Sequence, residues 1–318
     1  MNGTLAGGIA FQVLQSVLAV LIAPLVMGWV NQCRAWLQNK KGPGLVQPYR
    51  VINKLFHKDA VLAYSASPLF RATPYILFAC MWLAVGIVPM LATDLPFAPA
   101  ADVIALVGLF ALARVFISLA AMDIGTSFGT LGARREMMIG FLAEPAMLMT
   151  LFTASLISQS TSVVTIVETL GQRDFVIYPS MAFAATAFLM VLLAENARIP
   201  IDNPSTHLEL TMIHEAMILE YSARHLALVE WASSLKLTAY IALGIAIFAP
   251  WGIAETGDWG GLLIALPVLG LKLALAGAGL ALIETVSAKM RIFRAPEFLA
   301  TAFLLATLGM LTHFVLET

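Results

Sequence analysis

Carboxylates and histidines gather in one stretch of the chain, between two apolar segments that are each about twenty residues long. The stretch holds Glu195, Asp202, Glu209, Glu215, Glu220 and Glu230, together with His207, His214 and His225. Side chains of these types exchange protons or hold cations, and their placement beside apolar membrane segments is costly. The pattern therefore predicts proton or ion handling at a membrane boundary.

The composition predicts an integral membrane protein. Hydrophobic residues make up 60% of the 318 residues, charged residues make up 12%, and the mean hydropathy is +0.88. A soluble domain carries roughly twice this share of charged residues. The formal net charge of -1 gives no support for nucleic-acid binding, so we expect no nucleic-acid partner.

Apolar runs long enough to cross a bilayer core predict the secondary structure. They occur eight times, at 7–30, 73–93, 102–121, 137–158, 178–194, 232–252, 260–283 and 297–316. We therefore predict an all-α integral membrane protein with eight transmembrane helices in a single membrane domain, 1–318. The first run lacks a basic segment before it and a small-residue cleavage site after it, so it is interpreted as a retained helix rather than a signal peptide.

Basic residues lie mostly in the loops after the odd-numbered predicted spans. Fourteen fall there, namely Arg34, Lys40, Lys41, Arg50, Lys54, Lys58, Arg71, Arg134, Arg135, Arg198, Arg224, Lys289, Arg291 and Arg294. In the loops after the even-numbered spans, the sequence has Arg173 alone. Because cytoplasmic loops are enriched in Lys and Arg, we predict that the large loops after spans 1, 3, 5 and 7 are cytoplasmic and that both termini lie outside.

Cofactor motifs are missing from the sequence. Cys33 and Cys80 are too few to ligate an iron–sulfur cluster and do not form a CxxC pair. The pair His214-Glu215 is not followed by a second histidine at HExxH spacing, because Ile218 stands there. The sequence also lacks a glycine-rich phosphate loop and a GxSxG nucleophile motif. We expect no metal or other cofactor on this chain and place any redox cofactor on another subunit.

Charged residues inside the predicted spans are candidates for a proton relay, since a charge there is expensive. Glu144 lies in mid-span directly before Pro145, whose ring removes a backbone hydrogen bond and leaves a carbonyl that can hold water. Lys272 is about twelve residues from either end of its span, too deep to reach the interface easily. As a set, these titratable groups favour a relay.

Some of the charged residues also have structural interpretations. Buried charges can form ion pairs between helices and transfer nothing, and for Lys236, which is closer to the end of its span, we favour that interpretation. Arg114 and Asp123 are two and a half turns apart and so do not pair along one helix face. Glu209 follows Thr206 at the spacing of a capping box, so Glu209 alone fits a helix cap.

Three motifs resemble one known family. The run from Glu195 to Tyr221 contains Glu195-x-x-Arg198-x-Pro200-x-Asp202, Glu209-Leu210 and Glu220-Tyr221-Ser222, and is similar to the signature loop of the H-type membrane subunit of respiratory complex I and its relatives in membrane-bound NiFe hydrogenases. Residues 41–59 are similar to that family's GPG…LQP…KL segment. Residues 132–136 lead into a helix in which Glu144 matches the family's buried glutamate. The resemblance covers essentially the whole chain, including eight spans.

The signature loop also indicates the branch of this family. Complex I typically reads Arg-Thr-Pro-Phe-Asp-Leu-Pro-Glu-Ala-Glu-Ser-Glu-Leu, whereas this chain loses two acidic positions and has Ile199, Ile201, Asn203, Ser205 and His207. Residues 204–215 and 284–297 look more like hydrogenase-4 component C and formate hydrogenlyase subunit 4. In that branch the subunit anchors a cytoplasmic NiFe hydrogenase and its iron–sulfur subunits to antiporter-like pumping subunits.

The resemblance implies a membrane-anchor and ion-coupling subunit of a NiFe hydrogenase or formate hydrogenlyase-like complex, multi-pass in a prokaryotic inner membrane. The expected partners are the hydrogenase large and small subunits, an iron–sulfur subunit, antiporter-like membrane subunits and the lipid bilayer, with the NiFe centre and the iron–sulfur clusters on partner subunits. The expected proton relay is Glu144, Glu195, Asp202, Glu209, Glu215, Glu220 and Lys272. Arg198 is expected to organise the loop, and docking is expected at Arg34, Lys40, Lys41, Arg134 and Arg135. No catalytic residue and no metal ligand is expected on this non-cofactor-bearing subunit.

Three other functions share part of these features. A quinone-site subunit of a complex I-like NADH:quinone oxidoreductase would be inhibited by quinone analogues. A stand-alone ion transporter would show two related halves and interrupted helices at matching positions, which the sequence does not have. A purely structural anchor differs only in whether the buried carboxylates matter for ion flux. The sequence leaves open the electron donor, the transported ion, the binding of quinone, the retention of a NiFe site by the partner and the subunit composition.

Overall fold

The computed structural model describes residues 2–93, 101–172, 178–198, 201–202, 212–254, 259–288, 290 and 294–317, and within these ranges the regular elements are helices. In chain order they are α1 (Asn2–Leu37), α2 (Gln47–Phe56), α3 (Pro68–Ile87), α4 (Val103–Asp123), α5 (Ser127–Ser158), α6 (Val163–Gln172), α7 (Pro179–Glu195), α8 (His214–Ile218), α9 (Ala223–Phe248), α10 (Trp259–Val286), α11 (Ala295–Thr312) and η3 (His313–Glu317). The all-α prediction is confirmed.

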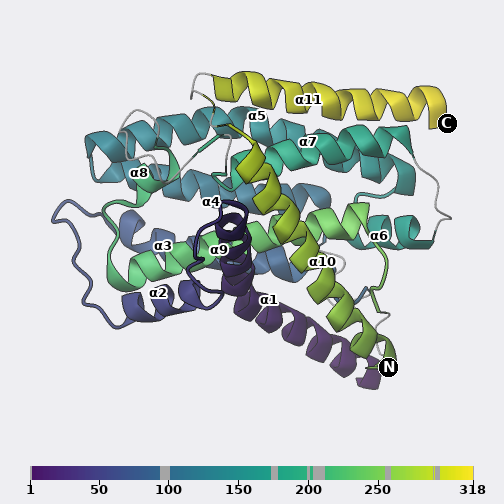
Figure 1. The fold of residues 1–318 in the computed structure, drawn as a ribbon, viewed down its shortest axis with the longest axis horizontal. Coiled ribbons are helices and arrows are strands. Elements are labelled where there is room, and N and C mark those ends of the chain that lie inside the picture. Colours follow the sequence, from purple (N-terminus) through teal and green to yellow (C-terminus); the bar gives the residue numbers. More distant parts are fainter. Residues whose placement is uncertain are drawn as a thin grey trace.

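The long helices form a bundle with two oblique members. In Figure 1, α3, α4, α5, α7, α9 and α11 run roughly side by side, while α1 and α10 cross them obliquely. Helix α4 packs on α3 and α5, α11 packs on α5 and α7, and α1 packs on α9 and α10. The short helices α2 and α8 lie at one end of the bundle and α6 lies at the other, as do the two chain termini.

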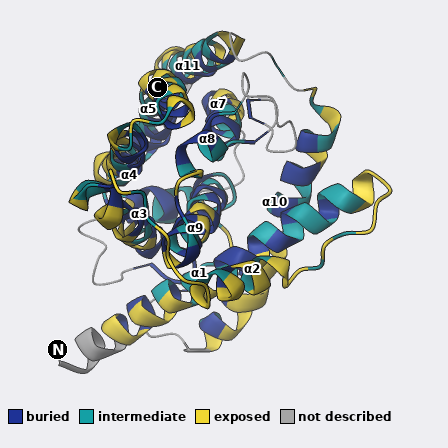
Figure 2. Ribbon diagram, turned by 90° about the vertical axis from the view of Figure 1, so that its left-hand side faces the viewer, coloured by how far each residue is buried: buried dark blue, intermediate teal, exposed yellow. Residues whose placement is uncertain are grey.

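The surface of the bundle suits lipid. Seven described helices are long and apolar enough to cross a membrane, namely Gly8–Leu37, Pro68–Ile87, Val103–Asp123, Ser127–Ser158, Ala223–Phe248, Gly260–Val286 and Ala295–Leu316. Figure 2, viewed along the bundle, shows exposed residues on the outer sides of these helices and buried residues toward the inside. On α10, Leu263 is 75% exposed and Leu275 is 64% exposed, which a lipid environment accommodates. The chain is a multi-pass membrane protein.

The predicted number of spans is not confirmed. Each of the eight predicted apolar runs overlaps a different helix among those described. Seven of these helices meet the length and composition of a span, whereas the fifth run, 178–194, corresponds to α7, which has 17 residues. That length is at the short end of what crosses a bilayer core of about 30 Å. The eight-span topology therefore stays a prediction.

Helices extend beyond the predicted apolar runs, which corrects the predicted loops. Helix α5 begins at Ser127, so Arg134 and Arg135 lie on a helix rather than in the loop after the third span. Arg34 lies in the last turn of α1, and Arg224 follows Ala223 at the start of α9. The apolar run marks only the part of a helix that suits lipid, and Arg, Glu and Met continue it because their helix propensities are high.

Local caps and a tight turn hold α4 against α5. Asp102 starts α4 by accepting a hydrogen bond from the Ile104 amide at 2.7 Å, and Thr126 starts α5 by accepting one from the Gly129 amide at 3.3 Å. Such caps stabilise a helix start by about 1 kcal/mol. Gly125 between the helices has φ +76, a conformation that glycine adopts without steric cost. The turn brings α5 back along α4.

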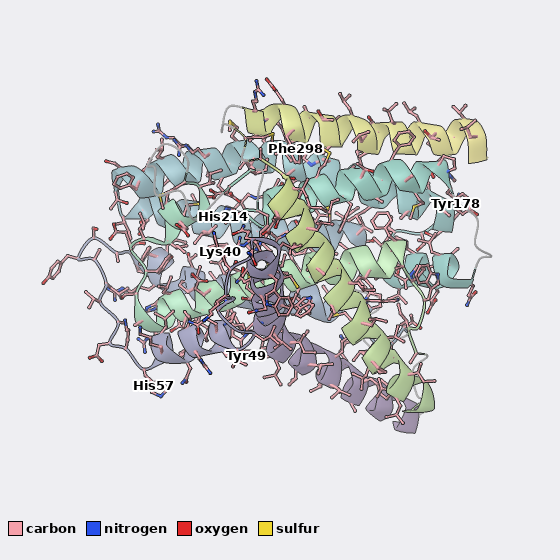
Figure 3. All side chains as sticks on the ribbon, viewed as in Figure 1. Lys40, Tyr49, His57, Tyr178, His214 and Phe298 are labelled. Atoms are coloured by element: carbon pink, nitrogen blue, oxygen red, sulfur yellow. The ribbon has the colours of Figure 1, made fainter. Side chains whose placement is uncertain are left out.

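The predicted orientation can be tested with cysteines at opposite ends of the bundle. Lys58 follows α2 and is exposed, and Gln172 ends α6 and is exposed. His57 and Tyr178, labelled in Figure 3, mark these two ends. In cells, Gln172→Cys should react with an impermeant thiol reagent, whereas Lys58→Cys should react only after the membrane is opened. The reverse labelling would show that the basic loops face outward. The native Cys33 and Cys80 are buried and serve as the unlabelled background.

Candidate functional site

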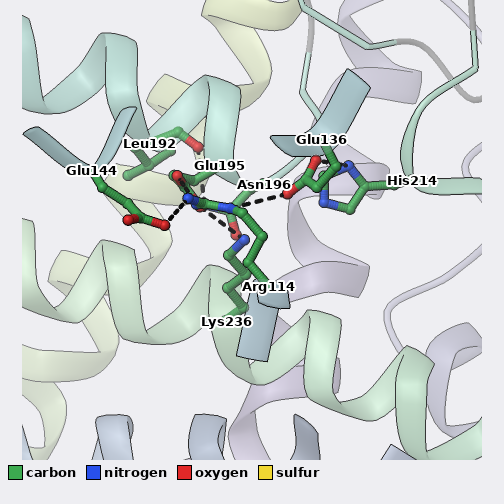
Figure 4. A network of polar contacts seen from close by, with 8 residues as sticks. All are labelled: Arg114, Glu136, Glu144, Leu192, Glu195, Asn196, His214 and Lys236. Atoms are coloured by element: carbon green, nitrogen blue, oxygen red, sulfur yellow. Dashed lines mark hydrogen bonds and ion pairs between the residues drawn. The ribbon is translucent and has the colours of Figure 1, made fainter. Parts of the chain in front are cut away.

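Arg114 is the centre of a buried group of ion pairs, shown in Figure 4. It lies on α4 and is 5% exposed. Its Nε donates to Oε1 of Glu136 at 3.3 Å, Nη1 donates to Oε1 of Glu144, and Nη2 donates to Oε1 of Glu195. Glu136 and Glu144 belong to α5 and Glu195 ends α7. One guanidinium therefore joins three helices.

Lys236 on α9 adds a second cation to this group. Its Nζ lies 3.0 Å from Oε2 of Glu195. This is an interhelical ion pair of the kind that the sequence favoured for Lys236. We call these five residues, Arg114, Glu136, Glu144, Glu195 and Lys236, the Arg114 cluster. With all five ionised the cluster carries one negative charge in excess, and an uncompensated buried charge is costly. Uptake of one proton would neutralise it.

A glycine on α5 makes room for the Arg114 side chain. A Cβ placed on Gly140 would lie 2.5 Å from Nη1 of Arg114 and 2.7 Å from its Cδ. Both distances are far below van der Waals contact. The small residue therefore lets the guanidinium lie against the backbone of α5, between Glu136 and Glu144 on the same helix.

A second ion-pair group connects α1, the loop after α7, and α10. Glu284 on α10 is 2% exposed. Its Oε1 accepts a hydrogen bond from Nη1 of Arg198 at 3.1 Å, and its Oε2 lies 3.4 Å from Nη1 of Arg34. Burial lowers the pKa of the Arg198 guanidinium, and the negative charge of Glu284 opposes this shift. Arg198 thus ties the signature loop to a helix 86 residues further along the chain.

A cavity of about 450 Å³ lies between the two ion-pair groups. Apolar side chains such as Met27, Leu77, Met81 and Phe110 line much of it. Its described lining also includes four basic residues, six acidic residues and one histidine: Arg34, Arg114, Arg198, Lys236, Glu136, Glu195, Asp202, Glu215, Glu230, Glu284 and His214. A volume of this size is within the range of sites for small molecules or cofactors. Both ion-pair groups therefore contact one internal space.

The signature loop is tied to α5 at the edge of this cavity. The backbone amide of His214 donates to Oδ2 of Asp202 at 3.3 Å. Nη1 of Arg135 donates to the carbonyl of Met212 at 2.9 Å. Nδ1 of His214 lies 3.5 Å from Oε2 of Glu136. Loop and cluster are thus in direct contact through His214 and Glu136.

The motif Glu220-Tyr221-Ser222 joins loops. The ring of Tyr221 stacks on that of Phe70 with centroids 4.0 Å apart, and its hydroxyl donates to the Phe70 carbonyl at 3.1 Å. Burial raises the pKa of Tyr221, which keeps the hydroxyl protonated as a donor. Ser222 donates to the carbonyl of Val61 at 2.6 Å. Tyr221 and Ser222 therefore hold the first loop and α3 against the start of α9, and Glu220 is exposed beside them.

The seven predicted relay residues fall into several groups. Glu144 and Glu195 belong to the Arg114 cluster. Asp202 and Glu215 line the adjoining cavity. Glu220 is exposed outside it, and Glu209 lies outside the described residues. Four of the seven therefore lie in or beside one connected site.

Lys272 lies apart from this site. Its Nζ donates to the carbonyl of Ala249 at 2.6 Å and to that of Trp251, and it lies 5.6 Å from the centre of the Trp251 ring. These groups belong to the segment that follows α9. Backbone carbonyls and the aromatic face thus stabilise the deep cation. The structure gives Lys272 no contact with the Arg114 cluster.

Glu136, Glu284 and His214 are site residues that the sequence analysis did not select. Glu136 stands one position before the predicted run 137–158, and Glu284 stands one position after the run 260–283. Neither was selected, because each falls outside its apolar run, although each is 2% exposed. A carboxylate directly flanking an apolar run is the sequence signal that could have found them. His214 belongs to the stretch of carboxylates and histidines that the sequence indicated, but it was not chosen as a relay residue.

The predicted docking residues differ in their surroundings. Lys40, Lys41 and Arg134 are exposed, whereas Arg34 and Arg135 are only partly exposed and make contacts within the chain.

In the described ranges, no group of three or more His, Cys, Asp or Glu side chains is arranged to hold a metal ion.

Comparison with known proteins places these features in a family. A model of the NADH dehydrogenase family matches residues 9–315. Hydrogenase-4 component C of Escherichia coli (strain K12) is 33% identical over 312 residues, covering 97% of this chain and 98% of that protein. Formate hydrogenlyase subunit 4 of the same organism is 31% identical over 295 residues, covering 93% of this chain and 95% of that protein.

More distant relatives share the fold. The H-type subunit of the NADH-quinone oxidoreductase of Streptomyces avermitilis is 23% identical over 257 residues, covering 71% of this chain and 54% of that protein. A chain in the structure of the membrane-bound sulfane sulfur reductase, an archaeal respiratory membrane complex, superposes with a TM-score of 0.81 at 19% identity, covering 96% of this chain and 99% of that chain. At this identity the likeness concerns the fold alone.

Proposed function

Because the chain belongs to the NADH dehydrogenase family, we propose that it is the membrane-anchor and ion-coupling subunit of a NiFe hydrogenase or formate hydrogenlyase-like complex in a bacterial inner membrane. The chain matches hydrogenase-4 component C and formate hydrogenlyase subunit 4 over almost its whole length, which supports the hydrogenase branch. The NiFe centre and the iron–sulfur clusters would be held by partner subunits. Residues 1–318 would act as one membrane domain.

The Arg114 cluster is the observation that carries the coupling role. It holds three carboxylates on one guanidinium inside the bundle, with one negative charge in excess when all are ionised. Such a group can take up and release a proton as charges nearby change. In the proposed route, protons pass from Asp202 and Glu215 at the cavity into the Arg114 cluster, and within the cluster from Glu195 to Glu144. Glu209 and Glu220 would supply protons at the cytoplasmic surface, and no role in this route follows for Lys272.

The experiment that tests the complex is purification of the tagged chain in mild detergent. We expect hydrogenase large and small subunits, an iron–sulfur subunit and antiporter-like subunits to copurify, with nickel and iron in the preparation. Reconstituted into vesicles, the complex should take up protons or sodium ions during hydrogen or electron turnover. Purification of the chain with no redox subunit would contradict the anchor role.

Docking is proposed at the exposed basic residues of the α2 and α8 end. Arg134 is exposed on α5. Arg135 donates a hydrogen bond to the Met212 carbonyl, so a substitution of Arg135 would also disturb the signature loop. Charge reversal at an interface weakens binding to a complementary surface. We therefore expect Arg134→Glu to release the soluble subunits while this chain stays in the membrane, as measured by native gel electrophoresis. Gln172→Glu at the opposite end is the control and should retain the complex. A full-strength complex with Arg134→Glu would exclude this interface.

The cavity supports quinone binding as a second candidate function. Its volume of about 450 Å³ and its largely apolar lining suit a small lipophilic molecule. A quinone analogue should then inhibit electron transfer by the purified complex, with competition from added quinone. Unchanged turnover at saturating analogue would leave the hydrogenase-anchor function without a quinone step.

A further inference from the structure

His214 and Glu136 face each other with no hydrogen bond between them. Nδ1 of His214 lies 3.5 Å from Oε2 of Glu136 (Figure 4). Neither atom has a hydrogen-bond partner within the described part of the chain. Buried polar atoms are nearly always paired, and leaving one unpaired is costly. A small approach of the two side chains would satisfy both atoms with one shared proton.

The two side chains differ in their access to the cavity. The side chain of His214 is 32% exposed, whereas that of Glu136 is 2% exposed. His214 lines the cavity and starts α8, which packs on α4 and α5. The other oxygen of Glu136 accepts the hydrogen bond from Nε of Arg114. The pair thus has one member that water in the cavity can reach and one member inside the Arg114 cluster.

Several charged groups lie near His214. Glu215 is its neighbour on α8, and Asp202 accepts the hydrogen bond from its backbone amide. Glu136 of α5 faces it, with Arg114 of α4 on the other side of Glu136, and Arg135 of α5 binds the carbonyl of Met212, two residues before it. Glu230 of α9 lines the same cavity. Imidazole is the side chain whose charged and neutral forms are both accessible between about pH 5 and 8.

We propose that His214 is the proton-transfer residue through which the Arg114 cluster takes up protons from the cavity. The imidazolium of His214 gives its Nδ1 proton to Oε2 of Glu136, so that the histidine becomes neutral and the glutamate becomes a carboxylic acid. A rotation of the ring then exposes Nδ1 to the cavity, where it takes the next proton from hydronium and a water molecule is released. No other bond forms or breaks in this step.

Proton uptake by Glu136 changes the pairing of Arg114. The neutral carboxylic acid attracts Nε less than the carboxylate does, and the guanidinium is left paired with Glu144 and Glu195. The charge of the cluster becomes zero. A proton that enters at Glu136 can therefore be followed by release of a proton elsewhere in the cluster, which links the loop that ends at α8 to the helices that hold Glu144 and Glu195.

The test uses variants that keep a hydrogen-bonding group but do not titrate. His214→Asn places an amide close to the position of Nδ1, and His214→Gln places one close to Nε2. With both variants we expect an assembled complex, about 10-fold or more slower ion uptake by vesicles, and a pH profile of uptake that differs from that of the wild type. His57→Asn is the control, because His57 is exposed directly after α2, where its Nδ1 lies 2.8 Å from the Asn53 carbonyl, and it does not line the cavity. This variant should behave as the wild type.

The inference rests on the proposed coupling function, and the outcomes separate the two. Wild-type uptake and pH profile in His214→Asn, together with loss of uptake in Glu144→Gln, would overturn the role of His214 and leave the coupling function standing. Normal uptake in both variants would overturn both. Failure of His214→Asn and His214→Gln to assemble, while His57→Asn assembles, would show that His214 has a structural role instead.

Discussion

Arg114→Met is expected to remove most of the chain from the membrane. The substitution leaves Glu136 and Glu195, each with a 2% exposed side chain, without their shared cation, and leaves Glu144 without its partner. Breaking a buried ion pair by removing one partner costs about 3–5 kcal/mol, which is a large part of the roughly 5–15 kcal/mol by which native proteins are stable. The amount of chain in purified membranes and its thermal midpoint in detergent measure this loss.

A conservative change and a surface change complete this experiment. Arg114→Lys keeps the charge, but a single ammonium cannot reach three carboxylates in the geometry of a planar guanidinium, so we expect less chain than in the wild type and more than with Arg114→Met. Arg50→Met removes an exposed arginine of α2 and should leave the amount unchanged. Wild-type amounts and stability of Arg114→Met would show that the ion pairs do not stabilise the bundle.

Glu144→Gln is expected to stop ion uptake without preventing assembly. The side chain of Glu144 is 34% exposed, far more than those of Glu136 and Glu195. Glutamine keeps the shape and can still accept a hydrogen bond from Arg114, and the remaining charges of Arg114, Lys236, Glu136 and Glu195 balance. The variant cannot titrate, so ion uptake per turnover should fall about 10-fold or more, while redox turnover with artificial carriers continues.

The matched control replaces a carboxylate outside the cluster. Glu297 is exposed in the first turn of α11, and Glu297→Gln should assemble, turn over and take up ions as the wild type does. Measurements of assembly, turnover and ion uptake in vesicles are needed for both variants. Normal ion uptake in Glu144→Gln, or its loss only because the complex fails to assemble, would support the structural interpretation of this carboxylate.

The sequence was sufficient for the class of protein and its family. Composition and eight long apolar runs predict an all-α membrane protein, because a bilayer imposes both a length and an apolar character on every span. The motifs of the first, third and fifth predicted loops indicate the family, and near-complete matches to two relatives agree with this. Glu144 and Glu195 could be selected because each carboxylate lies inside or at the end of an apolar run.

Helix boundaries and the positions of flanking charges required the structure. Glu136 and Glu284 fall just outside their apolar runs, yet each is buried. Hydropathy describes how well a segment suits lipid, whereas burial of a flanking charge depends on which other helix lies beside it. The same reason explains Lys272, whose deep position suggested a relay role and whose contacts are backbone carbonyls and a tryptophan ring.

Only the tertiary structure decided the partners of Arg114. They are 22, 30 and 81 residues away in the chain, and no spacing along one helix predicts such pairs. In a soluble protein, the polar side of an amphipathic helix shows which side faces inward. In these helices apolar residues cover most sides, because apolar side chains pack well against both lipid and neighbouring helices. The sequence therefore determined which charges enter the membrane, and the packing of α4 on α5, of α5 on α7 and of α7 on α9 determined which of them meet.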